Sequence, residues 1–115
     1  MAVKSRTVGV YGTPPLELAA PGAGARQFSP SQPGAEQLED LEVGALESLV
    51  MLAPPGALER RYELALALKT VRPGGQLTVM APKDRGGSRL RKELEAMGCE
   101  VTEEAKRHHR ICHIV

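Results

Sequence analysis

The stretch "LKTVRPGGQLTVMAPKDRGGSRLRKEL", from Leu68 to Leu94, decides the fold. It predicts the end of a helix, a Pro-Gly-Gly turn, an apolar strand, a basic glycine loop and the start of another helix. Pro73 cannot continue a helix, and the two glycines after it suit a turn. Helices and buried strands in this order are typical of the second half of an α/β domain.

The rest of the chain continues this alternation of strands and helices. Short apolar or β-branched runs bounded by Pro and Gly predict strands at residues 7–11, 25–28, 48–53, 76–81, 99–105 and 107–115. Strands that alternate with helices form a parallel sheet, and the tight connection between the last two strands makes that pair antiparallel. We therefore expect a three-layer, Rossmann-like α/β fold with a mostly parallel sheet and an antiparallel C-terminal strand.

Helical spacing of apolar residues predicts a helix at Ala57–Val71. Its expected buried face is Leu58, Tyr62, Ala65, Leu68 and Val71, and the side chains expected on its surface are Arg60, Arg61 and Lys69.

Capping residues predict the limits of the remaining helical segments. We expect Ser88 to cap the second long helix and Gly98 to end it. Thr13 is expected to cap a helix of one or two turns, with Pro14 at its first position. The acidic segment Leu38–Leu46 is expected to form a loop or a brief helix.

Composition indicates one domain with an aliphatic core. The chain has 115 residues, no Trp, one Phe and two Tyr, which suits helices packed on a parallel sheet better than a sandwich. Cys99 and Cys112 lack the spacing of a disulfide framework, so we expect a reducing, cytoplasmic setting. No run approaches membrane-spanning length, so no membrane partner is expected.

Charge is divided unevenly along the chain, although the net charge is only +1. Residues 1–68 hold five basic and eight acidic side chains, whereas residues 69–115 hold ten and six. A basic second half suggests an anionic partner, and the alternative is ordinary solvation of the surface.

The second half resembles the class I S-adenosylmethionine-dependent methyltransferase fold. In that family, a helix and a Pro-Gly-Gly turn lead into the fifth strand, as Leu68 and Arg72–Gly75 do here before the strand at 76–81. A helix, a sixth strand and an antiparallel seventh strand then finish the family's sheet. The resemblance covers residues 48–115 well and residues 7–28 loosely.

A narrower resemblance rests on "MAPKDRGGSRLRKELEAMG" followed by "RHHRICHIV". These segments are similar to the small-subunit ribosomal RNA guanine-N2 methyltransferases, which are tandem duplications of the fold. Their N-terminal copy has lost the cofactor site, and their C-terminal copy performs the chemistry. The resemblance implies that residues 1–115 are one methyltransferase-like domain, the N-terminal part of a longer protein.

Three segments lack the residues that cofactor and substrate binding require. A cofactor-binding first turn needs glycines for close backbone approach, but Gly12 is followed by Thr13, Pro14 and Pro15. The family places a carboxylate at the end of its second strand, where this chain has Arg26-Gln27-Phe28. After the fourth strand, catalytic relatives carry Asn-Pro-Pro-aromatic, where this chain has Ala53-Pro54-Pro55-Gly56. We therefore expect no cofactor-binding and no catalytic residues in this segment.

The loop before the second long helix is the candidate binding site. Glycines at a helix N-terminus can form an anion-binding nest. Positive charges in the first turn oppose the helix dipole at a cost of about 0.3–1 kcal/mol each, which favours a functional reason for them. Contact with RNA phosphates is one interpretation, and a solvated turn compensated by Glu93 and Glu95 is the other. The candidate residues are Lys83, Arg85, Gly86, Gly87, Ser88, Arg89, Arg91 and Lys92.

Other chemistry-bearing residues favour structural interpretations. On a strand, residues two apart share a face, and no such pair among His108, His109, Cys112 and His113 joins two metal ligands, so no metal site is expected. Cys99 is expected to be a small packing residue rather than a nucleophile.

The function that this reading favours is that of a non-catalytic domain. It would support RNA binding and cover a catalytic methyltransferase partner domain, with S-adenosylmethionine as the cofactor of the parent enzyme only. Because the chain ends in the apolar "ICHIV", self-association as a homodimer is a further expectation. Two alternatives stay open: an active methyltransferase with an atypical cofactor loop, and a dimerisation module with no RNA role.

Overall fold

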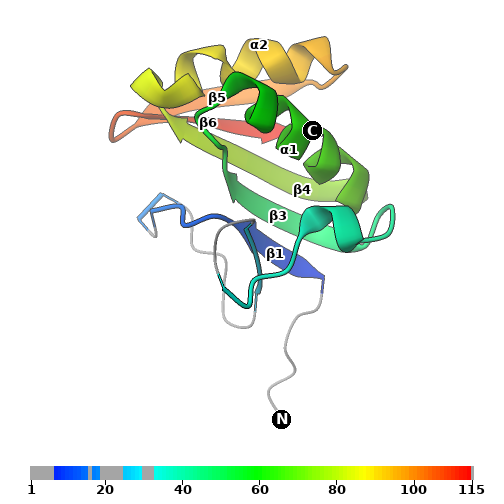
Figure 1. Ribbon diagram of the computed structural model, residues 1–115. Coiled ribbons are helices and arrows are strands. Elements are labelled where there is room, and N and C mark those ends of the chain that lie inside the picture. The colour runs from blue at the N-terminus through cyan, green and yellow to red at the C-terminus, as the bar shows by residue number, and fades with distance from the viewer. Residues whose placement is uncertain (1–6, 16, 19–24, 30–32, 115) are drawn as a thin grey trace.

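A computed structural model describes residues 7–15, 17–18, 25–29 and 33–114. Within these residues, six strands form one sheet in the order β2-β1-β3-β4-β6-β5 (Figure 1). The strands are β1 (Val8–Tyr11), β2 (Arg26–Phe28), β3 (Leu46–Leu52), β4 (Val71–Pro82), β5 (Val101–Lys106) and β6 (His109–Ile114).

The pairing of the strands confirms the predicted sheet. Neighbours among β2, β1, β3 and β4 are parallel, whereas β6 is antiparallel to both β4 and β5. The predicted strand positions are confirmed to within a few residues, except that β4 begins earlier, at Val71. Leu46 pairs with Val71 and Ser48 with Gln76, so the Pro-Gly-Gly residues form a bulge inside β4.

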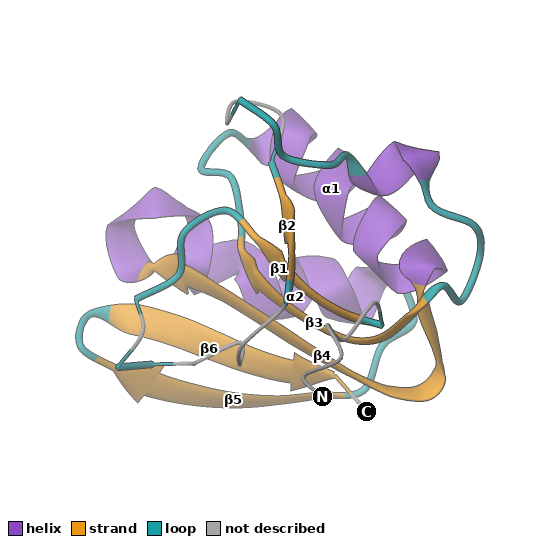
Figure 2. Cartoon of the chain, turned by 90° about the horizontal axis from the view of Figure 1, so that it is seen from below, coloured by secondary structure: helices purple, strands orange, loops and turns teal. Residues whose placement is uncertain are grey.

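Both long helices, α1 (Ala57–Thr70) and α2 (Ser88–Ala96), cover the same face of the sheet (Figures 1 and 2). The core lies between this face and the helices, where Leu64 and Ala67 of α1 and Leu90 and Leu94 of α2 pack against strand residues such as Leu49, Met51, Leu77 and Val79. Burying aliphatic side chains of this size stabilises the fold by roughly 1.5–3 kcal/mol each. Neither described helix has the length and apolar character that a bilayer crossing requires.

The sheet and the layer formed by α1 and α2 confirm the predicted α/β fold. The brief helix predicted after Thr13 falls partly outside the described residues. No helix is present at residues 13–15 or 17–18, where the Leu18 N–H donates to the Pro15 carbonyl in a turn, and the rest of that segment lies outside the described residues. The short 3₁₀ helix η1 (Leu38–Asp40) confirms the brief helix expected within 38–46.

The predicted apolar face of α1 is wrong at Leu58, Tyr62 and Ala65, whereas Leu68 and Val71 are partly buried and pack against the core. Leu58 is 81% exposed and Tyr62 is 53% exposed. The buried side chains of α1 are instead Arg60, Glu63, Leu64, Ala67 and Thr70. The helix is turned so that Arg60 and Glu63 face inward. Each of these charged side chains has a partner there, and helical periodicity alone does not reveal these partners.

Arg60 is the most deeply buried cation of the described residues, with only 2% of the residue exposed. Its Nε and Nη2 atoms donate to the two carboxylate oxygens of Glu93 on α2, at 2.5 and 3.0 Å. Its Nη1 atom donates to the Pro55 carbonyl at 2.8 Å. Burial disfavours a charged Glu93, but the bonds and charges of Arg60 and then Arg61 outweigh it and hold the pKa of Glu93 below its usual range. The pair joins α1, α2 and the turn after β3.

The ends of α2 confirm one predicted boundary and correct the other. Gly98 has φ +91°, and the Cys99 N–H donates to the Leu94 carbonyl at 3.1 Å, which ends the helix as expected. Ser88 is not the N-cap. Gly87, the last residue of the π-helical turn η2 (Lys83–Gly87), already has helical backbone with φ −60° and ψ −36°, whereas Arg85 and Gly86 do not.

We predict that Arg60→Ala lowers the free energy of unfolding by about 3–5 kcal/mol, because it leaves the largely buried Glu93 carboxylate without its bidentate partner. Arg61→Ala is the matched control. Its guanidinium also contacts Glu93, at 3.4 Å, but is 58% exposed, so the loss should stay below about 1 kcal/mol. Urea denaturation followed by circular dichroism measures both losses. Equal losses in the two variants would contradict the prediction.

Candidate nucleic-acid interface

The carboxyl ends of the parallel strands meet at one edge of the sheet, at the left in Figure 1. In α/β folds this edge is where ligands bind. It is built from Gly12–Pro15 after β1, Ala53–Gly56 after β3 and η2 after β4. The tip of the β5–β6 hairpin lies at the same edge, because β6 begins beside Pro82, the last residue of β4.

The backbone of the loop after β1 is already bonded within the protein. The Gly12 N–H donates to the Phe28 carbonyl at 2.9 Å, and the Gly12 carbonyl accepts from Gln27 Nε2 at 2.8 Å. Pro14, which lacks an N–H, is buried. The Gly12 N–H and carbonyl, which would have to face a bound nucleoside, are therefore bonded to residues of β2 instead.

The strand β2 carries no carboxylate of its own. Arg26, the first residue of β2, pairs with Glu36, to which its Nε donates at 2.8 Å. The Arg26 guanidinium also lies 5.5 Å from the centre of the Phe28 ring. At the carboxyl edge β2 ends in Phe28, so this strand supplies no carboxylate for ribose hydroxyls.

The two prolines after β3 orient Arg60. The Pro54 and Pro55 carbonyls accept from Arg60 Nη1, at 3.5 and 2.8 Å. Ala53 is buried, and Gly56 serves as the N-cap of α1. The motif that holds the target base in catalytic relatives therefore has a packing role in this chain.

The glycines of η2 also have a packing role. Gly86 has φ +99°, and a Cβ atom there would lie 2.4 Å from Arg60 Nη1. A Cβ atom at Gly87 would lie 2.6 Å from the Ala81 carbonyl oxygen. The Ser88 N–H, which an anion nest would use, donates back to the Lys83 carbonyl. The two glycines let the turn close on Arg60 and on the end of β4.

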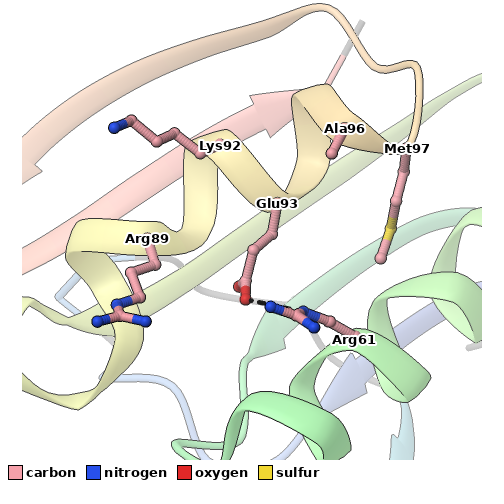
Figure 3. Close-up of a pocket in the computed structure, with 6 residues that line it drawn as sticks. All are labelled: Arg61, Arg89, Lys92, Glu93, Ala96 and Met97. Carbon is pink, nitrogen blue, oxygen red and sulfur yellow. Dashed lines mark hydrogen bonds and ion pairs between the residues drawn. The ribbon is translucent and has the colours of Figure 1, made fainter.

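The predicted basic residues divide between two surfaces. Arg89 and Lys92 of α2 join Arg61 of α1 around an open groove of about 710 Å³ (Figure 3). Arg91 lies on another face of α2 and pairs with Glu95 at 3.3 Å. The other lining residues of the groove are Glu93, Ala96 and Met97. We name this surface, defined by Arg61, Arg89 and Lys92, the interhelical groove.

Lys83 lies at the second surface, which the sequence analysis missed. Lys83 and residues 105–110 line a hollow of about 280 Å³ at the tip of the β5–β6 hairpin. The sequence signal for this surface is the basic run Lys-Arg-His-His-Arg at 106–110. Only its histidines were considered, and only as metal ligands. Arg85 is exposed in η2 and does not line either surface.

The histidines and cysteines have structural partners. His113 lies on β6, as predicted, where its Nε2 is 3.0 Å from Glu104 and its Nδ1 is 3.3 Å from the Thr78 hydroxyl. In the described part of the chain, no group of three or more His, Cys, Asp or Glu side chains could hold a metal ion. Both cysteines are free, and burial raises the pKa of both thiols, to about 12 for Cys112, which disfavours thiolate chemistry.

A buried carboxyl group lies beneath the loop after β1. Glu63 of α1 is only 5% exposed, and it accepts a hydrogen bond from the Tyr11 hydroxyl. Its Oε2 atom has no partner among the described residues. Burial, and then the charges of Glu39 and Glu59, raise the pKa of Glu63 to about 7. Burial, and then the charge of Glu63, raise the pKa of Tyr11 above its usual range.

A parallel sheet closed by an antiparallel hairpin, with the two helices after β3 and β4 on one face, is a Rossmann-like α/β fold. The solved structure of the T. thermophilus 16S rRNA N2 G1207 methyltransferase (RsmC), in complex with AdoMet and guanosine, matches it with a TM-score of 0.67. The match has 20% sequence identity and covers 92% of this chain but 34% of that chain. No protein-family model and no curated protein sequence matches. The predicted resemblance is thus confirmed at the level of the fold, and the chain spans about a third of that enzyme's length.

We predict that Glu63 makes the domain less stable as the pH rises. The pKa is about 7 in the folded state against an ordinary 4.5, so the folded state holds the proton more tightly. The contribution of Glu63 to the free energy of unfolding is therefore fully present below pH 4.5 and is lost as the pH rises through 7. Glu63→Gln removes this dependence and should raise the free energy of unfolding at pH 8 by about 2–3 kcal/mol.

Urea denaturation of both proteins between pH 4.5 and pH 8 tests this prediction. Glu100→Gln, which removes an exposed carboxylate just before β5, is the control and should change the pH profile little. A profile for Glu63→Gln that runs parallel to that of the native chain would count against the assignment.

Proposed function

We propose that this chain is a non-catalytic methyltransferase-like domain of a ribosomal RNA guanine-N2 methyltransferase, where it supports RNA binding and a catalytic partner domain. The observation that carries the proposal is the extent of the structural match. The methyltransferase fold covers 92% of this chain, yet the chain corresponds to only 34% of the similar enzyme. A tandem enzyme of the kind that the sequence resembles contains such a domain beside a catalytic copy.

The residues at the carboxyl edge do not fit S-adenosylmethionine. The Gly12 N–H and carbonyl are bonded to Phe28 and Gln27, and Pro14 is buried in the same loop. β2 ends in Phe28, where the family would place the carboxylate that binds the ribose. In this proposal the cofactor belongs to the partner domain, and no methyl transfer takes place on this chain.

We predict that isothermal titration of the isolated chain with S-adenosylmethionine gives no saturable heat. The loop after β1 would have to break the two Gly12 hydrogen bonds before its backbone could contact a nucleoside. A cooperative urea transition in the same buffer verifies that the chain is folded. Saturable binding with micromolar affinity would favour the alternative of an active methyltransferase with an atypical cofactor loop.

The interhelical groove supports the RNA-binding part of the proposal. It presents three cations, and its one carboxylate, Glu93, is held by the buried Arg60 as well as by Arg61. Cations on the rim therefore exceed the anions that could neutralise them. Among the described residues, no aromatic side chain lines the groove, so contact with phosphates rather than stacking of bases is expected.

We predict that Arg89→Ala weakens binding to a fragment of small-subunit ribosomal RNA, whereas Arg91→Ala does not. Both changes remove one positive charge from α2, but only Arg89 lines the groove. For each phosphate contact that is lost, the log–log dependence of affinity on salt should fall by about 0.7–0.9. Fluorescence anisotropy at several salt concentrations measures this slope. If the combined Arg89→Ala, Arg91→Ala and Lys92→Ala variant bound RNA as the native chain does, a dimerisation module without an RNA role would be favoured.

A further inference from the structure

The tip of the β5–β6 hairpin has an uncommon backbone conformation. Arg107 and His108 are the two described residues other than glycine with positive φ, at +51° and +61°. They form a two-residue turn in which both positions are left-handed, a conformation for which hairpins usually use Asn and Gly. Arg107 and His108 carry large side chains in this turn despite the conformational cost. Backbone strain of this kind is a feature of functional sites.

The turn is held rigidly against the end of β4. The Lys83 N–H donates to the His108 carbonyl at 2.8 Å. The His109 Nδ1 atom lies 2.8 Å from the Arg107 carbonyl oxygen, which can only accept, so the ring donates to it. Lys106 pairs with His109 at the last position of the β5–β6 ladder. The side chains around the tip therefore project from a fixed frame.

The hollow at this tip is cationic. Its lining of Lys83 and residues 105–110 includes no carboxylate. Among the described residues, no carboxylate forms an ion pair with Lys83, Lys106 or Arg110, and Arg107 reaches only Glu17, at 3.9 Å with both side chains exposed. An exposed contact of that length leaves most of the charge of Arg107 available to a ligand.

We propose that this hollow binds a phosphate group of an RNA backbone. Lysine and arginine side chains converge on it without an aromatic platform, which suits a phosphodiester rather than a base. Its volume of about 280 Å³ accommodates a phosphate with part of its sugar. That the ligand is RNA rests on the proposed function. The site itself rests on the geometry and charge of the hairpin tip.

A neighbouring hollow of about 400 Å³ indicates how the hollow at the hairpin tip and the interhelical groove, the two proposed RNA surfaces, connect. It is lined by Lys83, Asp84, Ser88 and His108, so it joins the hairpin tip to the first residue of α2. The Asp84 carboxylate disfavours an anion at that place, so the phosphate binds on the Lys106 side of His108. One RNA strand can then contact both the hairpin and the interhelical groove.

The test compares two double variants that remove the same charge. Lys106→Gln/Arg107→Asn acts at the hairpin, where asparagine tolerates the left-handed backbone and keeps the turn. Lys69→Gln/Arg72→Gln removes two cations from the opposite, amino edge of the sheet. The binding of a labelled single-stranded fragment of small-subunit ribosomal RNA is followed by fluorescence anisotropy at several salt concentrations, and urea denaturation verifies each fold.

We expect the hairpin variant to lower the slope of log affinity against log salt by about 0.7, which is the loss of one phosphate contact from a single strand. The amino-edge variant should leave the slope unchanged. If the native chain binds RNA and both variants match it, the hairpin site is wrong while the proposed function stands. A folded native chain without measurable RNA affinity would overturn both.

Titration with tripolyphosphate, followed by amide chemical shifts in ¹⁵N-labelled protein, examines the site without RNA. We expect the largest shifts at Lys83 and at residues 106–110, and their loss in the hairpin variant. Shifts confined to the first turn of α2 would overturn the assignment to the hairpin.

Discussion

The buried ion pair between Arg60 and Glu93 is the interaction on which the arrangement of this domain depends. It ties α1 to α2, and through its third donor it holds the Pro54-Pro55 turn at the carboxyl edge. Removing one partner of such a pair leaves a charge in a poorly solvated place, so the pair constrains how the two helices can sit on the sheet. The glycines of η2 complete the same junction, since any larger residue at position 86 would collide with the guanidinium.

This junction explains why elements that surround ligands in the methyltransferase fold have other roles here. The two prolines after β3 bind Arg60, and the glycine turn after β4 closes over it. At the opposite side, the loop after β1 is bonded to β2 through Gly12. Positive charge is left on the outer surfaces, in the interhelical groove and at the hairpin tip.

Much of the fold could be predicted because it depends on local chemistry. The strands at 8–11, 26–28 and 46–52 follow apolar runs, and the final pair follows a short connection. The prediction for the face of α1 was wrong because it placed Arg60 on the surface and left Glu63 out, although each has a partner from another element. The N-cap at Ser88 was wrong because the backbone of η2 is itself helical as far back as Gly87.

The sequence by itself determined where the chain is extended, where it is helical and where Gly98 ends a helix, because these depend on residues a few positions apart. Only the tertiary structure decided that Arg60 is buried and that both helices cover one face. It also decided that Lys83 lies at the hairpin tip, whereas Arg89 and Lys92 line the interhelical groove. The physical reason is that burial and charge pairing depend on which distant side chain lies opposite. The bond between Arg60 and Glu93 joins residues 33 positions apart.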